Sequence, residues 1–218
     1  MTEFVDPYFD DEHGCLRNRL GITDPDELGA REHAIVAVRQ RQLDQRPGAP
    51  AATVDAWRAV HRHLFGDIYD WAGEFRTVNI TKGTHTFHPA SHLHIAADYC
   101  ANAMRDIARL DRPNRDVLAE RLSELLADMN EAHPFREGNG RTQRVIVGQL
   151  AAHHDHPIAW RVSSPIQNIE LSIAAVDDPQ AFARPIRIAM DFAADYDVST
   201  ASDPATGLGI DRRFDLDR

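Results

Sequence analysis

Apolar side chains recur every three or four positions along most of this chain, a spacing that predicts α-helices. Helix starts are marked as well: Asp24 to Glu27 has a capping-box pattern with proline at the first helical position, and Thr53 is a favourable N-cap. Pro134 is expected to stop the helix that delivers His133. The predicted helices cover residues 24–43, 53–65, 91–110, 114–131, 141–154, 164–176 and a last stretch from Pro179 or Gln180.

The same spacing predicts which side chains form the core. Each helix has one apolar face, so the expected fold class is mainly α, with the apolar faces packed together in one domain. A chain of 218 residues with 43% hydrophobic content is long enough for such a core. The residues expected inside include Leu28, Ile35, Val38, Trp57, Leu64, Met104, Val117, Leu122, Ile146, Met190 and Phe192.

Two segments depart from the helical period. Residues 75–87, FRTVNITKGTHTF, alternate and are rich in β-branched side chains, and Lys82-Gly83 supplies a turn, so a β-hairpin is expected. After Tyr196 the chain is polar without an apolar period. Residues 197–218 are therefore expected to form a flexible tail outside a domain of residues 1–196.

The densest chemistry lies between Met129 and Arg144, in MNEAHPFREGNGRTQR. His133 is the group of this run that takes up a proton near neutral pH, because an unperturbed imidazole titrates at roughly 6.5, and it is the candidate base. Glu137 is a hard oxygen ligand of the kind that holds Mg²⁺ while nucleotide phosphates complete the octahedron. The run therefore predicts a base beside a Mg²⁺-dependent phosphate site.

An anion-binding turn follows these two residues. Gly138, Asn139 and Gly140 permit several backbone N–H groups to face one way, and the next helix adds the positive end of its dipole. Arg141 and Arg144 lie three residues apart on one helical face, where guanidinium groups can grip more distal phosphates. A glycine-rich turn is also a common helix C-terminus, with Gly138 as its left-handed cap. The complete set, in order, favours the phosphate site.

The run resembles the signature of the Fic family, H-x-F-x-(D/E)-G-N-G-R-x-x-R, at every specified position. Residues 64–76, LFGDIYDWAGEFR, resemble the family's helix and turn ahead of the active-site flap, and residues 15–22, CLRNRLGI, its N-terminal segment. The resemblance covers most of residues 8–196. It implies a Fic-type helical bundle with one β-hairpin flap over the active site, and an enzyme that moves AMP from ATP to a hydroxyl of a cytosolic target protein, releasing pyrophosphate.

The resemblance also implies a role for each residue of the run. His133 would deprotonate the attacking hydroxyl, and Glu137 would hold Mg²⁺ between the α- and β-phosphates. The amides of residues 138–140 would stabilise the charge that builds on the transferred group. Arg141 and Arg144 would bind the β- and γ-phosphates.

Two further features follow from the resemblance. Gly140 favours AMP as the transferred group, because relatives of the Doc type carry another residue there and transfer the γ-phosphate of a reversed nucleotide. The flap would pair with an extended piece of the target by strand addition, in which backbone bonds determine the register. The flap residues expected to dock the target are Thr81, Lys82, Gly83 and Thr84.

Other activities remain open on the sequence. The chain could transfer a different nucleotide-derived group, such as phosphate or UMP, or be a non-catalytic interaction module that binds a nucleotide. A transition-metal site is disfavoured, because the clustered histidines are irregularly spaced and lack a cysteine or carboxylate pattern. They are expected to be solvated or to lie at helix ends; they are His85, His88, His92, His94, His153, His154 and His156.

Composition excludes further classes of protein. The 24 Lys and Arg against 34 Asp and Glu produce a net charge of −10, which disfavours direct binding to nucleic acid. Cys15 and Cys100 are too few for a disulfide framework, and the N-terminus has no apolar signal region. No stretch reaches the roughly 18 apolar residues of a membrane span. A soluble, cytoplasmic protein without membrane contact is expected.

A separate inhibitor is also expected. Many Fic proteins carry an inhibitory helix with the motif (S/T)-x-x-x-E-(G/N), whose glutamate pairs with the second motif arginine, here Arg144. Only Thr23 has a glutamate four positions on, Glu27, and Leu28 follows where Gly or Asn is required. The chain thus resembles stand-alone, toxin-like members restrained by a small antitoxin. Such members suggest DNA gyrase and topoisomerase IV as first candidate targets.

Overall fold

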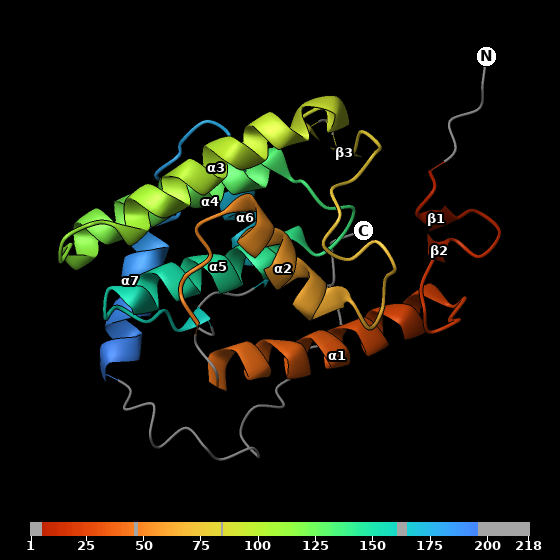
Figure 1. The fold of residues 1–218 in the computed structure, drawn as a ribbon, viewed down its shortest axis with the longest axis horizontal. Coiled ribbons are helices and arrows are strands. Elements are labelled where there is room, and N and C mark those ends of the chain that lie inside the picture. The colour runs from red at the N-terminus through yellow and green to blue at the C-terminus, as the bar shows by residue number, and fades with distance from the viewer. Residues whose placement is uncertain (1–5, 46–47, 84, 161–164, 196–218) are drawn as a thin grey trace.

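The computed structural model describes residues 6–45, 48–83, 85–160 and 165–195, and helices dominate it (Figure 1). The predicted mainly α fold is confirmed, with boundaries within a few residues of those expected. The helices are α1 (Pro25–Gln45), α2 (Val54–Phe65), α3 (Leu93–Ala108), α4 (Arg115–Ala132), α5 (Asn139–His153), α6 (Pro165–Ala174) and α7 (Ala183–Asp195), with a 3₁₀ turn at Ala90–His92.

Local side-chain caps explain where the helices begin. The Thr53 hydroxyl accepts a hydrogen bond from the Ala56 N–H at 3.0 Å, as predicted for the start of α2. The Asn114 side chain accepts from the Val117 N–H at 2.9 Å and starts α4 in the same way. Asp24 accepts from N–H groups in the first turn of α1. These caps act within three residues, which is why the sequence alone could locate them.

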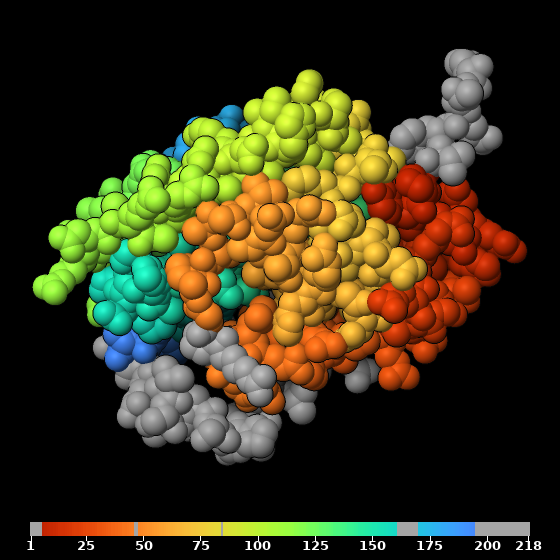
Figure 2. Space-filling view, in the orientation of Figure 1, coloured from red at the N-terminus to blue at the C-terminus, as the bar shows by residue number. Residues whose placement is uncertain are grey.

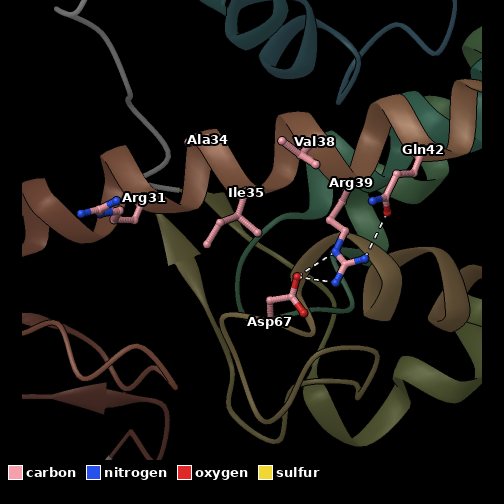
Figure 3. A pocket seen from close by; sticks show the side chains of 7 residues that line it. All are labelled: Arg31, Ala34, Ile35, Val38, Arg39, Gln42 and Asp67. Atoms are coloured by element: carbon pink, nitrogen blue, oxygen red, sulfur yellow. Dashed lines mark hydrogen bonds and ion pairs between the residues drawn. The ribbon is translucent and has the colours of Figure 1, made fainter.

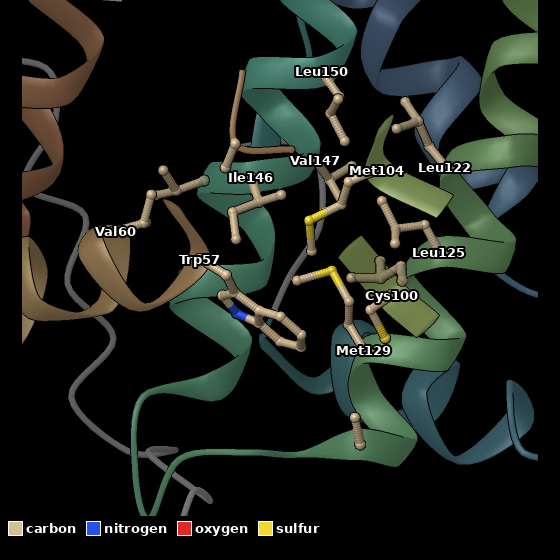
Figure 4. Packing of buried hydrophobic residues seen from close by; sticks show 14 of the residues in the cluster. Trp57, Val60, Cys100, Met104, Leu122, Leu125, Met129, Ile146, Val147 and Leu150 are labelled. Atoms are coloured by element: carbon tan, nitrogen blue, oxygen red, sulfur yellow. The ribbon is translucent and has the colours of Figure 1, made fainter. Parts of the chain in front are cut away.

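Helix α4 lies at the centre of the bundle, where it packs against α3, α5 and α7. Figure 1 shows α1 along one edge of the molecule and α3 along the opposite edge, with α2 and α5 between them. The core forms where the apolar faces of α2, α3, α4 and α5 meet (Figure 4). Its members include Trp57, Val60, Cys100, Met104, Leu122, Leu125, Met129, Ile146, Val147 and Leu150.

Three residues predicted to be buried are exposed instead. Val38, Val117 and Phe192 keep 60%, 43% and 47% of their surface accessible. Val38 lines a groove between α1 and Asp67, beside the ion pair in which Arg39 Nε donates to Asp67 at 2.7 Å (Figure 3). Periodicity identifies an apolar face, but the width of the face that becomes buried depends on how many neighbours cover the helix.

Two short hairpins accompany the helices. The predicted hairpin is confirmed within residues 75–87, although its strands β3 (Thr81–Lys82) and β4 (His85–Thr86) have only two residues each. A second hairpin, formed by β1 (Phe9–Asp10) and β2 (Cys15–Leu16), was not expected. Thr84 and the expected tail of residues 197–218 lie outside the described residues.

The N-terminal segment packs against the turn that precedes the flap, and Figure 2 shows it in red beside the yellow segment. The Arg19 N–H donates to the Ile68 carbonyl at 2.7 Å, and the Thr77 N–H donates to the Tyr8 hydroxyl at 3.0 Å. These bonds attach the segment to the turn that supports the candidate site. Within the described ranges, none of the helices combines the length and hydrophobicity that a membrane crossing requires.

Candidate active site

His133 lies at the point where α4 ends. Its backbone is left-handed, with φ of 41° and ψ of 58°, and its N–H donates to the Met129 carbonyl at 3.1 Å, so His133 is the C-cap. The alternative expectation, Gly138 as a helix C-cap, is wrong. Gly138 is left-handed, with φ of 80°, but it is the N-cap of α5.

The His133 ring has a defined tautomer. Its Nδ1 lies 3.2 Å from the Asn130 carbonyl oxygen. A carbonyl can only accept, so the proton of the neutral ring is on Nδ1 and the lone pair is on Nε2. The ring stacks on Phe87, with centroids 4.0 Å apart and an interplanar angle of 23°. This arrangement orients Nε2 as a proton acceptor.

Arg76 fastens His133 to the base of the flap. Its buried guanidinium donates to the carbonyls of His133 at 2.8 Å, Val78 at 2.8 Å and His88 at 2.5 Å. Burial lowers the pKa of Arg76 to about 10, so the group stays charged at neutral pH, at the negative end of α4. Sequence reasoning missed this residue because its acceptors are backbone carbonyls, which no side-chain pattern marks.

The loop between His133 and α5 is closed by a side-chain amide. The buried Asn139 amide accepts from the Phe135 N–H at 2.9 Å and donates to the Phe135 carbonyl at 2.8 Å. Asn139 was predicted as a phosphate-binding residue, and this clamp leaves only its backbone N–H for that role. Phe135 is fully buried and stacks on His61 at 3.8 Å between ring centroids, which anchors the loop in the core.

The N-terminus of α5 lies directly after this loop. The helix begins at Asn139, two residues earlier than predicted, so the glycine-flanked turn is itself the first turn of the helix. The first N–H groups of a helix have no intrahelical acceptor and carry its positive dipole end. The Gly138 N–H donates to the Glu137 carboxylate at 2.8 Å. The predicted metal ligand therefore lies over the predicted anion site.

Arg144 lies beside the same turn. A methyl group built on Gly140 would lie 3.7 Å from Arg144 Nη1, an ordinary contact distance, so this guanidinium lies on the side of the turn where a side chain at position 140 would be. Glu137, the α5 N-terminus and a motif guanidinium therefore gather in one place, as the sequence predicted. A carboxylate beside N–H groups and a guanidinium suits a phosphate chain that carries a divalent cation.

The Arg141 guanidinium contacts two carboxylates. Its Nη2 lies 2.6 Å from Glu32 Oε1 and 3.2 Å from Glu137 Oε1. Sequence reasoning did not select Glu32, which comes from α1 and is only 7% exposed. A signal existed: Leu28, Glu32 and Val36 follow one another at four-residue spacing on the buried face of α1. A carboxylate within such a face indicates a buried partner.

His61, also missed, connects the loop to the turn before the flap. Its Nδ1 accepts from the Gly73 N–H at 2.8 Å, so the ring proton is on Nε2, which lies 3.0 Å from the Glu137 carbonyl oxygen. Burial lowers the pKa of His61 to about 3. The ring is therefore a neutral bridge that holds the Glu137 backbone in place.

The depressed pKa of His61 predicts a pH-dependent stability. Between about pH 6.5 and about pH 3 the unfolded chain binds a proton at His61 that the folded chain does not, so the free energy of unfolding falls as pH falls. The stability advantage of the native protein over His61→Asn should shrink by about 1 kcal/mol per pH unit between pH 6 and 4. Urea denaturation at several pH values measures this. Parallel curves for the two proteins, or an equal effect of His94→Asn at an exposed position, would contradict it.

Gly138 has a position that admits no side chain. A Cβ there would lie 2.3 Å from the Phe65 ring, which is fully buried, and φ is positive. Gly138→Ala should therefore lower the free energy of unfolding by about 2–4 kcal/mol, combining backbone strain with overpacking. The control is Gly83→Ala, where φ is +60° but nothing lies within 4 Å, so only the backbone strain remains. Equal losses in urea denaturation would refute the steric argument.

The flap carries the residues predicted to dock a target. Thr81 pairs with Thr86 and Lys82 with His85 in antiparallel register, and Thr81, Lys82 and Gly83 are exposed. His85 Nε2 lies 3.0 Å from Glu131 Oε2, which ties the flap to α4. Thr84, the fourth predicted docking residue, lies outside the described residues.

The clustered histidines at the end of α5 contact backbone carbonyls. Ring nitrogens of His153, His154 and His156 lie within hydrogen-bond distance of backbone carbonyls at and after the end of α3. This confirms the expectation of helix-end histidines for that group. Among the described residues, no three His, Cys, Asp or Glu side chains gather closely enough to bind a metal ion by themselves.

Sequence comparisons identify relatives of this chain. Residues 51–151 match the model of the Fic/DOC family. The chain is 32% identical over 175 residues to protein adenylyltransferase VbhT of Bartonella schoenbuchensis, covering 79% of this chain and 35% of that protein's length. It is 30% identical over 159 residues to the probable protein adenylyltransferase Fic of Escherichia coli, covering 72% of this chain and 77% of that protein.

Solved structures share the fold. The BepC protein of Bartonella tribocorum with bound AMPPNP has a TM-score of 0.78 at 18% identity, over 84% of this chain and 95% of that one. A Fic domain from Bartonella quintana with bound ADP also has a TM-score of 0.78, at 21% identity, over 84% and 93% of the two chains. At these identities the likeness shows the arrangement of the helices.

Proposed function

The chain belongs to the Fic/DOC family, and from this premise we propose that it is a protein adenylyltransferase, which transfers AMP from ATP to a hydroxyl side chain of a target protein. One observation carries the proposal: the Nε2 lone pair of His133 and the N-terminus of α5 lie at the two ends of one short, clamped loop. The names of the relatives support it, as do AMPPNP and ADP in proteins of the same fold.

In the proposed reaction, residues of this site accept the proton, stabilise the transferred group and bind the leaving group. His133 Nε2 takes the proton of the target hydroxyl, whose oxygen attacks the α-phosphorus of ATP. The bond from the α-phosphorus to the oxygen that bridges it to the β-phosphorus breaks, and pyrophosphate leaves. The N–H groups at the start of α5, residues 138–140, stabilise the charge on the transferred group, and Arg144 binds the departing phosphates.

Mg²⁺ fits the donors of this site. Glu137 would hold the ion, and its carboxylate suits Mg²⁺, which commonly takes one or two carboxylates and fills its octahedron with phosphate oxygens and water. Bound there, the ion would neutralise phosphate charge. The role of the protein is to keep the Glu137 carboxylate over α5, through its bond with the Gly138 N–H and the His61 contact to its carbonyl.

Gly140 supports AMP rather than phosphate as the transferred group. An added Cβ at this position meets only Arg144, at 3.7 Å, so the first turn of α5 is open to a phosphate chain. In the flap, Thr81, Lys82 and Gly83 are exposed and suit pairing with an extended segment of the target.

A separate inhibitor and a toxin-like role belong to the same proposal. Thr23 and Glu27 fit the inhibitory motif only in part, and the Glu27 N–H is capped by Asp24, as expected for an ordinary helix start. DNA gyrase and topoisomerase IV are the first targets to test. Purified chain without a partner should transfer AMP to itself, to lysate proteins or to purified gyrase; inactivity under all three conditions would argue against a separate inhibitor.

The test of the activity is mass spectrometry. The chain is incubated with ATP and Mg²⁺, alone and with bacterial lysate, beside His133→Ala. An AMP adduct that is absent with the variant would support adenylylation and identify the target. A phosphate adduct would contradict adenylylation and indicate transfer of the γ-phosphate from a reversed nucleotide. A UMP adduct formed from UTP would indicate that UTP is the substrate. If no nucleotide produced an adduct, the chain would be a non-catalytic module that binds a nucleotide.

A further inference from the structure

Glu32 links the first helix to the nucleotide loop. It lies on α1, outside the stretch of residues 51–151 that matches the family, yet its carboxylate reaches Arg141 on α5. The two Glu32 oxygens have different partners: Oε1 lies 2.6 Å from Arg141 Nη2, and Oε2 accepts a hydrogen bond from the Tyr69 hydroxyl. Tyr69 is 2% exposed, and burial together with the Glu32 charge raises its pKa, so it stays a neutral donor.

Arg141 is shared between two carboxylates. The same Nη2 atom lies 2.6 Å from Glu32 and 3.2 Å from Glu137, so the contact to Glu32 is the shorter. The guanidinium also lies over the Phe65 ring, 4.9 Å from its centroid, which limits where it can move. If Glu32 lost its charge, Glu137 would be the charged one of the two carboxylates that contact Arg141. A guanidinium paired tightly with Glu137 competes with a cation for the same oxygens.

We propose that Glu32, held by Tyr69, is a positioning residue that draws Arg141 toward α1 and so leaves the Glu137 carboxylate able to bind Mg²⁺. The inference rests on the proposed function, because it concerns the metal ligand of that site. In the proposed site, Glu32 would contact Arg141 and Tyr69 rather than nucleotide or metal. Its effect passes through Arg141, as in metal sites where outer partners orient the ligands.

The experiment compares ADP binding by calorimetry with and without Mg²⁺ for the native protein and Glu32→Gln. ADP avoids turnover, so the readout is independent of activity. The gain in ADP affinity that Mg²⁺ confers should be about tenfold smaller in Glu32→Gln, while Mg²⁺-free affinity should not fall. Glu32→Asp keeps the charge and should retain most of the gain. Tyr69→Phe, which frees Glu32 to shift, should lose part of it.

Glu27→Gln is the matched control, since it is the same substitution on the same helix at an exposed site, and it should behave as the native protein. An unchanged Mg²⁺ gain in folded Glu32→Gln would overturn the inference, and so would an equal loss with and without Mg²⁺, which indicates a general structural role. If Glu32→Gln does not fold, Tyr69→Phe decides: a reduced gain supports the inference, and an unchanged gain overturns it. Native protein that binds no ADP would overturn the proposed function as well.

Discussion

Replacing His133 with alanine should lower AMP transfer by roughly 10²- to 10⁴-fold, the usual contribution of a positioned general base. The substitution removes the Nε2 lone pair that the bond from Nδ1 to the Asn130 carbonyl orients. ADP affinity should not change, because the anion-binding N–H groups belong to α5 and not to the His133 ring. Initial rates of AMP incorporation and calorimetry with ADP measure the two effects separately.

His133→Asn is the companion variant. The backbone at His133 is left-handed, a conformation that asparagine tolerates better than alanine, so this variant removes the base with less strain at the end of α4. Both variants should lose transfer to a similar extent. If His133→Asn kept near-native rates while binding ADP, His133 would not be the base, and if both variants lost ADP binding, the loss of activity would reflect a disturbed loop.

Replacing Arg76 with methionine should lower the free energy of unfolding by about 3–5 kcal/mol. The change keeps much of the apolar stem but leaves the buried carbonyl of Val78 and the partly buried carbonyls of His133 and His88 without this donor. Transfer should fall as well, because Arg76 ties the residue that carries the base to the flap. Urea denaturation at neutral pH measures the stability, and AMP incorporation measures the activity.

Two variants make the Arg76 result interpretable. Arg76→Lys keeps the charge without the planar fork, so it should recover only part of the stability. Arg121→Met removes an exposed arginine that pairs with Glu124 at 2.9 Å and should cost at most about 1 kcal/mol. If Arg76→Met were no more destabilising than Arg121→Met, the carbonyl contacts would not contribute as argued.

The helices could be predicted because their signals are local. Caps such as Thr53 and Asn114 act on N–H groups three residues away, and the apolar period is contained in each segment. Burial was less predictable, as Val38 shows: it belongs to the apolar pattern, but α1 is an edge helix and Val38 lines a groove beside Asp67, where it stays 60% exposed. The apolar pattern predicts a helix and its apolar face, whereas the exposure of each side chain depends on the elements that pack beside that helix.

The reactive residues of the candidate site could also be found from the sequence, because they occupy one short stretch. The residues that hold them could not. Arg76 reaches His133 across 57 positions, and His61 reaches Glu137 across 76. Glu32 acts from α1 on a motif arginine of α5. Each of these contacts depends on how separate helices pack.

The sequence by itself determined the helical class, most helix boundaries and the hairpin, and it predicts the base, carboxylate and anion-binding turn on which the proposed nucleotide transfer rests. Only the tertiary structure decided the tautomers of His133 and His61, the division of Arg141 between Glu32 and Glu137, and the clamp of Asn139 on Phe135. The physical reason is the range of the interactions. Periodicity and capping act within a few residues, whereas orientation of a reactive group depends on carbonyls and carboxylates that folding brings together from distant segments.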